Sequence, residues 1–250
     1  MAEIQLAKKI LIFIPIFLFL FQDVSFAALN SPIPGINTSS EPQAVASSIK
    51  IILLLTVLSV APAILLLMTS FTRIVIVLSF VRTSLGTQQM PPNQVIVGLA
   101  LFLTMFVMGP IFSDINQHAL QPLMDGKITQ EQAFDTASKP LKEFMAKQTR
   151  EKDLNLFLDY TKSEKPKTVQ DIPLHVLVPA FAISELKTAF QMGFMIFLPF
   201  LIIDMIVSSI LMAMGMMMLP PVLISLPFKI LLFILVDGWH LIVKSLLTSF

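Results

Sequence analysis

The sequence from about residue 189 to residue 247 is almost continuously apolar, and the adjacent prolines Pro220 and Pro221 divide it. About 20 consecutive apolar residues suffice for a helix to cross a bilayer, so this run is long enough for two helices. Consecutive prolines remove two backbone donors and disfavour helix in the residue before them. We therefore expect an antiparallel pair of apolar helices, with the diproline as the hinge of the hairpin.

Two further apolar blocks lie at 49–71 and 95–112, and the whole chain is 55% hydrophobic and only 13% charged, with a mean hydropathy of +0.82. Soluble domains carry about 25% charged residues. One soluble core cannot bury this much apolar surface, so a membrane is the expected solvent. The predicted fold is all-α and membrane-associated, with apolar helical hairpins at 49–112 and 185–250 and a helical domain at 113–184.

The first 27 residues have the order of a secretory signal peptide. Lys8 and Lys9 form a positive region, residues 10–21 a short apolar core, and residues 25–27 a small-x-small cleavage site. The apolar core is shorter than a comfortable span, although an uncleaved anchor is the alternative. Residues 28–48 are rich in proline, serine and asparagine, which predicts a flexible leader after a signal peptide at 1–27.

A cleaved signal peptide would leave the new N-terminus outside the cytoplasm, and this fixes the side of each later connection. The 70–94 connection would then be cytoplasmic. Its charges are Arg73 and Arg82, with no acidic residue, as the positive-inside rule expects. The 113–184 segment would lie on the periplasmic side, because long loops are translocated whatever their charge.

The 113–184 segment carries its own helical signals. Thr129 and Gln132 have the spacing of a capping box at a helix N-terminus. An apolar stripe follows at three- and four-residue spacing, which predicts one buried helix face. So narrow a stripe needs a partner, either other helices of the chain or another copy, and we expect it to mediate contacts between copies: Phe134, Leu141, Phe144 and Met145.

Five charged residues of 185–250 lie within or beside apolar sequence and are expected to be buried in an assembly: Glu185, Lys187, Asp204, Lys229 and Asp237. With the hairpin turn at the diproline, Asp204 lies sixteen residues before the turn and Lys229 only eight after it. The two would not be level, so a partner from another subunit is expected. An ion or proton pathway is the alternative interpretation, because charges at membrane depth often line such pathways.

Sequence signals for catalysis are lacking. The chain has no glycine-rich phosphate loop, GxSxG or HExxH motif, and it has no cysteine. Its histidines are far apart, at 118, 175 and 240, without metal-ligand spacing. The net charge of +1 does not favour nucleic acid. We expect no catalytic residue, no metal, no cofactor and no enzymatic activity.

Several segments resemble the FliP family of flagellar export-gate proteins, related to the YscR and SpaP proteins of injectisomes. They are "LLMTSFTRIVIVLSFVRTSLGTQQMPPNQVIVGLALFLTMFVMGP" (66–110), "PLKEFMAKQTREKDLNLFL" (140–158), "PAFAISELKTAFQMGF" (179–194), "LPFLIIDMIVSSILMAMGMMMLPP" (198–221) and "FKILLFILVDGW" (228–239). The resemblance runs in order and spacing from about residue 50 onwards.

This resemblance implies a ring of several copies, with five as the implied number, that joins FliR and FliQ in a helical channel of the bacterial inner membrane. Unfolded flagellar subunits would pass through it at the flagellar basal body. Other export-apparatus membrane proteins and the proton-motive force would supply the energy, while membrane lipid surrounds the complex. It also implies that the apolar hairpins are largely lifted out of the bilayer, so hydropathy overstates the number of spans.

Five methionines precede the diproline, with Gly215 among them to let the backbone leave the helix: Met212, Met214, Met216, Met217 and Met218. Repeated around a ring, these flexible side chains would form a gasket that seals the resting pore. The alternative is that they fill irregular gaps between helices. Two other functions remain open: a secondary transporter with Asp204 and Asp237 as coupling carboxylates, and a structural membrane scaffold.

Overall fold

The computed structural model describes residues 42–87, 89–162, 166–216 and 218–250. The predicted signal peptide at 1–27, most of the predicted leader and Met217 lie outside these residues. The chain divides into two units, Met1–Ala61 and Pro62–Phe250. The first is represented by residues 42–61, all in helix α2 (Pro42–Leu67), so the last seven residues assigned to the leader are helical.

Every regular element of the described residues is a helix, which confirms the all-α class. After α2 come α3 (Phe71–Leu85), α4 (Asn93–Ile115), the π-helix η1 (Asn116–Leu120), α5 (Gln121–Met124), α6 (Gln130–Gln148) and α7 (Glu151–Thr161). The 3-10 helix η2 (Val169–Asp171) then leads into α8 (Leu174–Ala213), α9 (Pro221–Leu235) and α10 (Gly238–Thr248).

Two helical stretches of the described chain are long and apolar enough to cross a membrane, Asn93–Met124 and Leu174–Ala213. A third span results if α9 and α10 count as one broken span. These lengths agree with the predicted membrane association. Length and composition thus allow two or three spans in the part of the chain that the structure describes.

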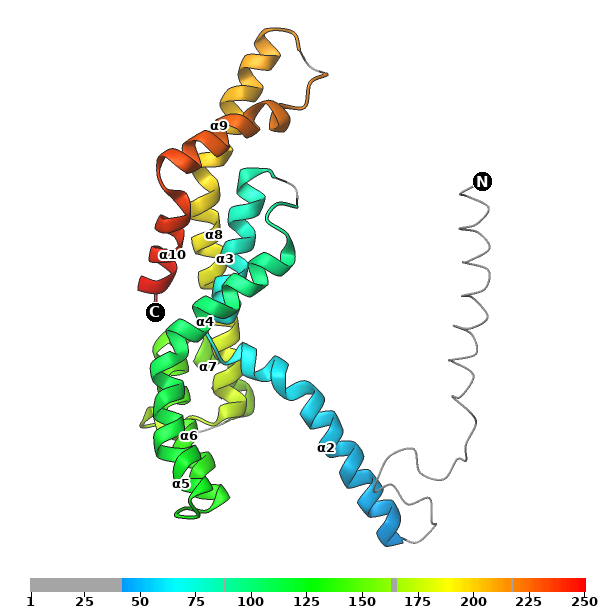
Figure 1. The fold of residues 1–250 in the computed structure, drawn as a ribbon, viewed down its shortest axis with the longest axis vertical. Helices are drawn as coiled ribbons and strands as arrows, with labels where there is room; N and C mark the ends of the chain where they lie inside the picture. The colour runs from blue at the N-terminus through cyan, green and yellow to red at the C-terminus, as the bar shows by residue number, and fades with distance from the viewer. Residues whose placement is uncertain (1–41, 88, 163–165, 217) are drawn as a thin grey trace, which may run out of the picture. The chain divides into compact units, whose positions relative to one another are not determined.

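The long helix α8 is the central element of the second unit, and α3, α6, α7 and α9 pack along it (Figure 1). Its first half packs with α6 and α7 in a core of Met145, Leu158, Ile172, Val176, Leu177 and Phe181. Its second half packs with α3, α4, α9 and α10, and α3 supplies five of the buried residues there: Ile74, Val77, Leu78, Val81 and Leu85. The predicted boundary between residues 184 and 185 therefore falls inside one continuous helix.

Close approach between α3 and α8 depends on a glycine. A Cβ atom at Gly193 would lie 2.5 Å from the ring of Phe80, a distance that real side chains do not adopt. Because glycine has no side chain, the two helices can approach until the Phe80 ring covers the backbone of α8. The predicted capping box is also present, with the Gln132 backbone N–H donating to Thr129 Oγ1 over 3.3 Å.

The sequence predicts a single helix after the diproline, but the structure has two. Helices α9 and α10 meet at an angle of 63° across the break at Val236 and Asp237. Asp237 adopts a left-handed conformation with φ of 50°. Gly238 follows, and a Cβ there would lie 2.4 Å from the Phe233 ring. Beyond the bend, Ile242 and Leu246 of α10 join the core around the second half of α8.

Candidate functional site

The methionine loop, residues 212–219, forms the tip of the α8–α9 hairpin (Figure 1). Helix α8 ends there in a Schellman motif: the Met216 N–H donates to Leu211 O over 2.9 Å, and the Gly215 N–H to Met212 O over 3.0 Å. Gly215 has a φ of +74°, which glycine adopts without strain. This confirms that Gly215 lets the chain leave the helix.

The diproline starts the next helix instead of forming the turn. Pro220 is the N-cap of α9 and Pro221 its first residue, a position where the missing proline N–H is not needed by the helix. The chain reverses through the methionine loop before them. The described methionines of the loop are exposed: Met212 59%, Met214 59%, Met216 46% and Met218 99%. The flexible apolar side chains at this tip are not packed against the described part of their own chain.

A buried ion pair links the two arms of the hairpin. Lys229 Nζ lies 2.6 Å from Asp204 Oδ2, and the Ser225 hydroxyl donates to Asp204 Oδ1 over 2.5 Å. Lys229 also donates to the main-chain oxygen of Ser84, on α3, over 3.3 Å. Lys229 is almost fully buried, whereas the Asp204 side chain keeps 26% of its surface exposed. Three helices, α3, α8 and α9, meet at this amine.

This pair corrects the expectation that Lys229 takes its partner from another subunit. Asp204 lies nine residues before the end of α8 at Ala213, and Lys229 lies eight residues after the start of α9 at Pro221. The two are level because they lie at nearly equal distances from the helix ends that flank the loop. The expected mismatch arose because the residues between Ala213 and Pro221 are not helical. If they were, Asp204 would lie about two turns further from the hinge than Lys229.

A second buried ion pair lies in the first half of α8. The Arg73 guanidinium, on α3, donates to both carboxylate oxygens of Glu185, with Nε 2.8 Å from Oε2, and the two side chains are 2% and 0% exposed. Its Nη1 donates to Ser249 O over 2.8 Å and its Nη2 to Gln148 Oε1 over 2.9 Å. The Phe250 ring covers the guanidinium, with its centroid 4.1 Å from Cζ. Helices α3, α6 and α8 and the residues after α10 therefore meet at Arg73.

Arg73 was missed as a site residue because its charge was assigned to a cytoplasmic connection. The signal for burial was present in the sequence. Val77 and Val81 follow Arg73 at four-residue spacing, so Arg73 lies on the buried face of an apolar helix. Glu185, the opposite charge within an apolar helix, was recognised, but its partner was not.

The FliP family model matches residues 54–246 of the chain. A flagellar biosynthetic protein FliP of Bacillus subtilis (strain 168) is 71% identical over 216 residues, covering 86% of this chain and 98% of the relative. The corresponding protein of Pectobacterium carotovorum subsp. carotovorum is 52% identical, with 87% and 86% covered. That of Treponema pallidum (strain Nichols) is 44% identical, with 97% of each chain covered.

The chain belongs to the FliP family. It is thus a flagellar biosynthetic protein of the export apparatus, and its long apolar helices give it a membrane location. FliP proteins are export components and not a known family of enzymes. Among the described residues no cluster of three histidine, aspartate or glutamate side chains could hold a metal ion.

The remaining predicted residues have separate environments. Met145 is fully buried in the core of α6, α7 and α8, so it is a core residue and is not available to another copy. Leu141 and Phe144 are partly buried against the same core, and the Phe144 ring packs on Phe181 at 5.9 Å. Phe134 is 65% exposed, while Lys187 and Asp237 lie at the surface.

Proposed function

We propose that the chain is a channel subunit of the flagellar export gate, and that its methionine loop seals the resting pore. The observation that supports this proposal is the hairpin tip. Three described methionines, Met214, Met216 and Met218, project from a loop with no apolar cover in the described residues of the chain. Exposed apolar groups of this kind need a partner, which a ring of identical tips would provide.

Assembly with other copies follows from the surface of the α8–α9 hairpin. Large apolar side chains on both helices are exposed, among them Ile202, Met205 and Ile206 on α8 and Leu231 and Ile234 on α9. We infer a ring of several copies, with five as the expected number, that joins FliR and FliQ and other export proteins. Phe134 is the residue of the predicted α6 stripe that remains free to contact another copy.

The conduit would carry unfolded flagellar subunits across the bacterial inner membrane at the basal body. We place the 113–184 segment on the periplasmic side and the α3–α4 turn, with Arg82, on the cytoplasmic side, after cleavage of the signal peptide near residue 27. Arg73 no longer supports this orientation, because its charge is neutralised by Glu185 inside the chain.

A methionine gasket would work through bulk and mobility. A constriction lined with apolar groups stops ions because water leaves it. Unbranched thioether side chains adopt many conformations, so they can part around different polypeptides and close again. No single sulfur atom is needed for this, and replacement of any one methionine of the loop is expected to be tolerated.

The proposal is tested by replacing Met214, Met216 and Met218 together with alanine. Alanine cannot reach its neighbours across the axis, so cells that produce the export gate should leak small ions while flagellar export falls only moderately. The measurement is conductance of the purified complex in planar bilayers, together with motility. Leucine at the same three sites should keep the seal.

A matched control replaces three exposed methionines outside the loop, Met90, Met105 and Met124, with alanine. This variant loses the same number of methionines and should remain as tight as the parent. If the loop variant assembles and is equally tight, the methionines do not seal the pore.

A further inference from the structure

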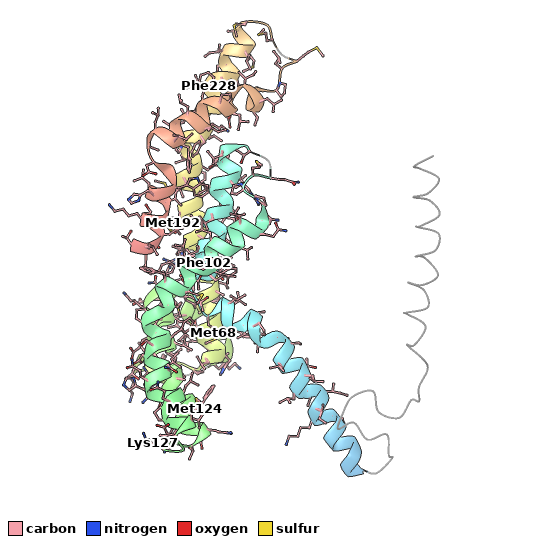
Figure 2. The ribbon with its side chains drawn as sticks, viewed as in Figure 1. Met68, Phe102, Met124, Lys127, Met192 and Phe228 are labelled. Atoms are coloured by element: carbon pink, nitrogen blue, oxygen red, sulfur yellow. The ribbon has the colours of Figure 1, made fainter. Side chains whose placement is uncertain are left out.

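An apolar cavity of about 410 Å³ lies between α8 and α10, on the outside of the packed helices. It is lined by Gln191, Met192, Met195, Ile196, Leu241, Ile242 and Ser245. Figure 2 shows Met192 on α8 beside α10. Five of these seven side chains are apolar, and two are methionines, which adapt to an irregular ligand.

The size of the cavity favours a slender occupant. The groove, at about 410 Å³, falls in the range of small-ligand pockets, roughly 300–1,000 Å³. A single hydrocarbon chain is slender enough to lie along a groove of this volume.

The polar groups of the groove gather at one end. Helices α8 and α10 run antiparallel here, so Gln191 is level with Ser245 while Ile196 is level with Leu241. Lys187 precedes Gln191 by one helical turn, and Lys244 is adjacent to Ser245. Both lysines are exposed, and among the described residues neither has an ion pair. The groove is therefore apolar along its length and basic at one end.

The lysines also stand at one end of an uncharged stretch of both helices. Residues 188–203 of α8 contain no charged residue, and α10 has none before Lys244. Lysines at such positions extend their amines towards the polar headgroups of a bilayer. A basic rim between membrane helices is the chemistry that recognises anionic phospholipid headgroups.

We propose that this groove binds one acyl chain of an anionic phospholipid, with its phosphate at Lys187 and Lys244. The ligand holds α10 against α8 and fills space that the protein side chains leave open. The site requires the α8–α10 face to contact the bilayer and requires nothing of the methionine loop, so it stands apart from the proposed gasket. Lys187 then contacts lipid and is not a buried assembly residue.

The sole tryptophan of the chain, Trp239, lies two residues before Leu241 and reports on the groove. The full chain is purified with its export-gate partners and reconstituted in vesicles that contain brominated phosphatidylglycerol or brominated phosphatidylcholine. Brominated lipid quenches tryptophan fluorescence. A complex with Trp239→Phe measures the quenching of tryptophans in the partners, which is then subtracted. The parent should bind phosphatidylglycerol in preference. Removing one lysine should lower this preference about fivefold, the effect expected for one basic residue at an anionic surface.

Two variants separate the headgroup from the acyl chain. Lys187→Gln with Lys244→Gln should abolish the preference for phosphatidylglycerol, whereas Lys139→Gln with Lys152→Gln, on exposed lysines of α6 and α7, should keep it. Ser245→Phe should fill the groove and reduce quenching by both lipids. Equal quenching by the two lipids in the parent overturns the proposal. The proposal is also overturned if both lipids quench Trp239 in the Ser245→Phe variant as strongly as in the parent. It is overturned as well if Ser245→Phe blocks assembly of copies while the parent shows no lipid preference, because the groove would then be a contact between copies.

Discussion

The two halves of α8 each contain a buried ion pair, and the pairs are completed differently. At Arg73 the guanidinium donates to Glu185, Gln148 and Ser249, and both charged side chains are buried. At Lys229 the amine is buried, but its partner Asp204 keeps about a quarter of its side-chain surface exposed. The Arg73 site is complete within one chain, whereas the Asp204 site can accept a further donor.

The same contrast holds for the apolar surface. Around the first half of α8, the Phe144 ring packs on both Phe181 and Phe250. Around the second half, the α8–α9 hairpin exposes its apolar side chains up to Met218 at the tip. We call the first half, whose ion pair and aromatic contacts are complete within the chain, the closed half. We call the second half, whose hairpin leaves apolar side chains exposed, the open half.

Removal of the Glu185 charge should have the largest effect, because it tests the closed half. Glu185→Gln leaves the Arg73 charge buried without compensation, which costs about 3–5 kcal/mol of folding free energy. The expected result is a large drop in thermal unfolding midpoint, followed by circular dichroism in detergent. Glu131→Gln, on an exposed glutamate of α6, is the control and should change little.

A double variant makes this prediction sharper. Arg73→Met with Glu185→Met removes both charges and keeps apolar bulk, so most of the lost stability should return. If the double variant is less stable than Glu185→Gln alone, the Arg73 hydrogen bonds to Gln148 and Ser249 matter more than charge compensation.

Substitution of Asp204 tests the open half and should have an intermediate effect. Asp204→Ala removes the partner of Lys229 and of Ser225, a loss of about 1–3 kcal/mol for hydrogen bonds that include a charged group. Asp204→Asn keeps an acceptor and should be milder. The measurement is the yield of assembled complex, because the partly exposed Asp204 is expected to matter more in the ring than in the single chain.

The same variants bear on a proton-coupled role. The in-chain bond to Lys229 favours a structural role for Asp204, so export should follow complex yield in each variant. An Asp204→Asn protein that assembles fully but loses export driven by the proton-motive force would instead support a transporter-like carboxylate.

Phe250 joins the closed half from the end of α10. Its ring lies over Arg73 and stacks on Phe144 with centroids 6.2 Å apart. Phe250→Ala should cost about 1–2 kcal/mol, from one aromatic pair and one partly desolvated cation–π contact. Phe250→Leu keeps apolar volume but loses both aromatic contacts. Equal thermal unfolding midpoints for the two variants would show that volume alone matters here.

The sequence predicted the helical class, the capping box at Thr129 and the departure of the chain from α8 at Gly215, because each depends on local pattern. It failed where the answer depends on which helices pack together. The spacing of Arg73 shows a buried helix face, but only the fold shows that Glu185, 112 residues later, meets it. Whether Lys229 and Asp204 lie side by side depends on where α8 ends and α9 begins. No residue pattern marks the length of the loop between them.

The smallest effect on the unfolding midpoint is expected from replacement of Gly215. Gly126, outside α8 and the α8–α9 hairpin, has a similar backbone conformation and serves as its matched control. Gly215 and Gly126 have φ of +74° and +69°, and in both cases a Cβ atom would meet open space. Alanine in this conformation costs about 1 kcal/mol through the backbone alone. Gly215→Ala and Gly126→Ala should therefore lower the unfolding midpoint by similar, small amounts.

Their effects on the gate should differ. Gly126 lies in the turn between α5 and α6, whereas Gly215 sets the point at which the methionine loop leaves α8. An alanine at 215 favours further helix, which would turn Met216 and Met218 away from their present directions. Conductance of the assembled complex should rise for Gly215→Ala and stay at the parental level for Gly126→Ala. Because the two variants carry the same backbone cost, equal conductance would show that the exit of the chain from α8 does not position the seal.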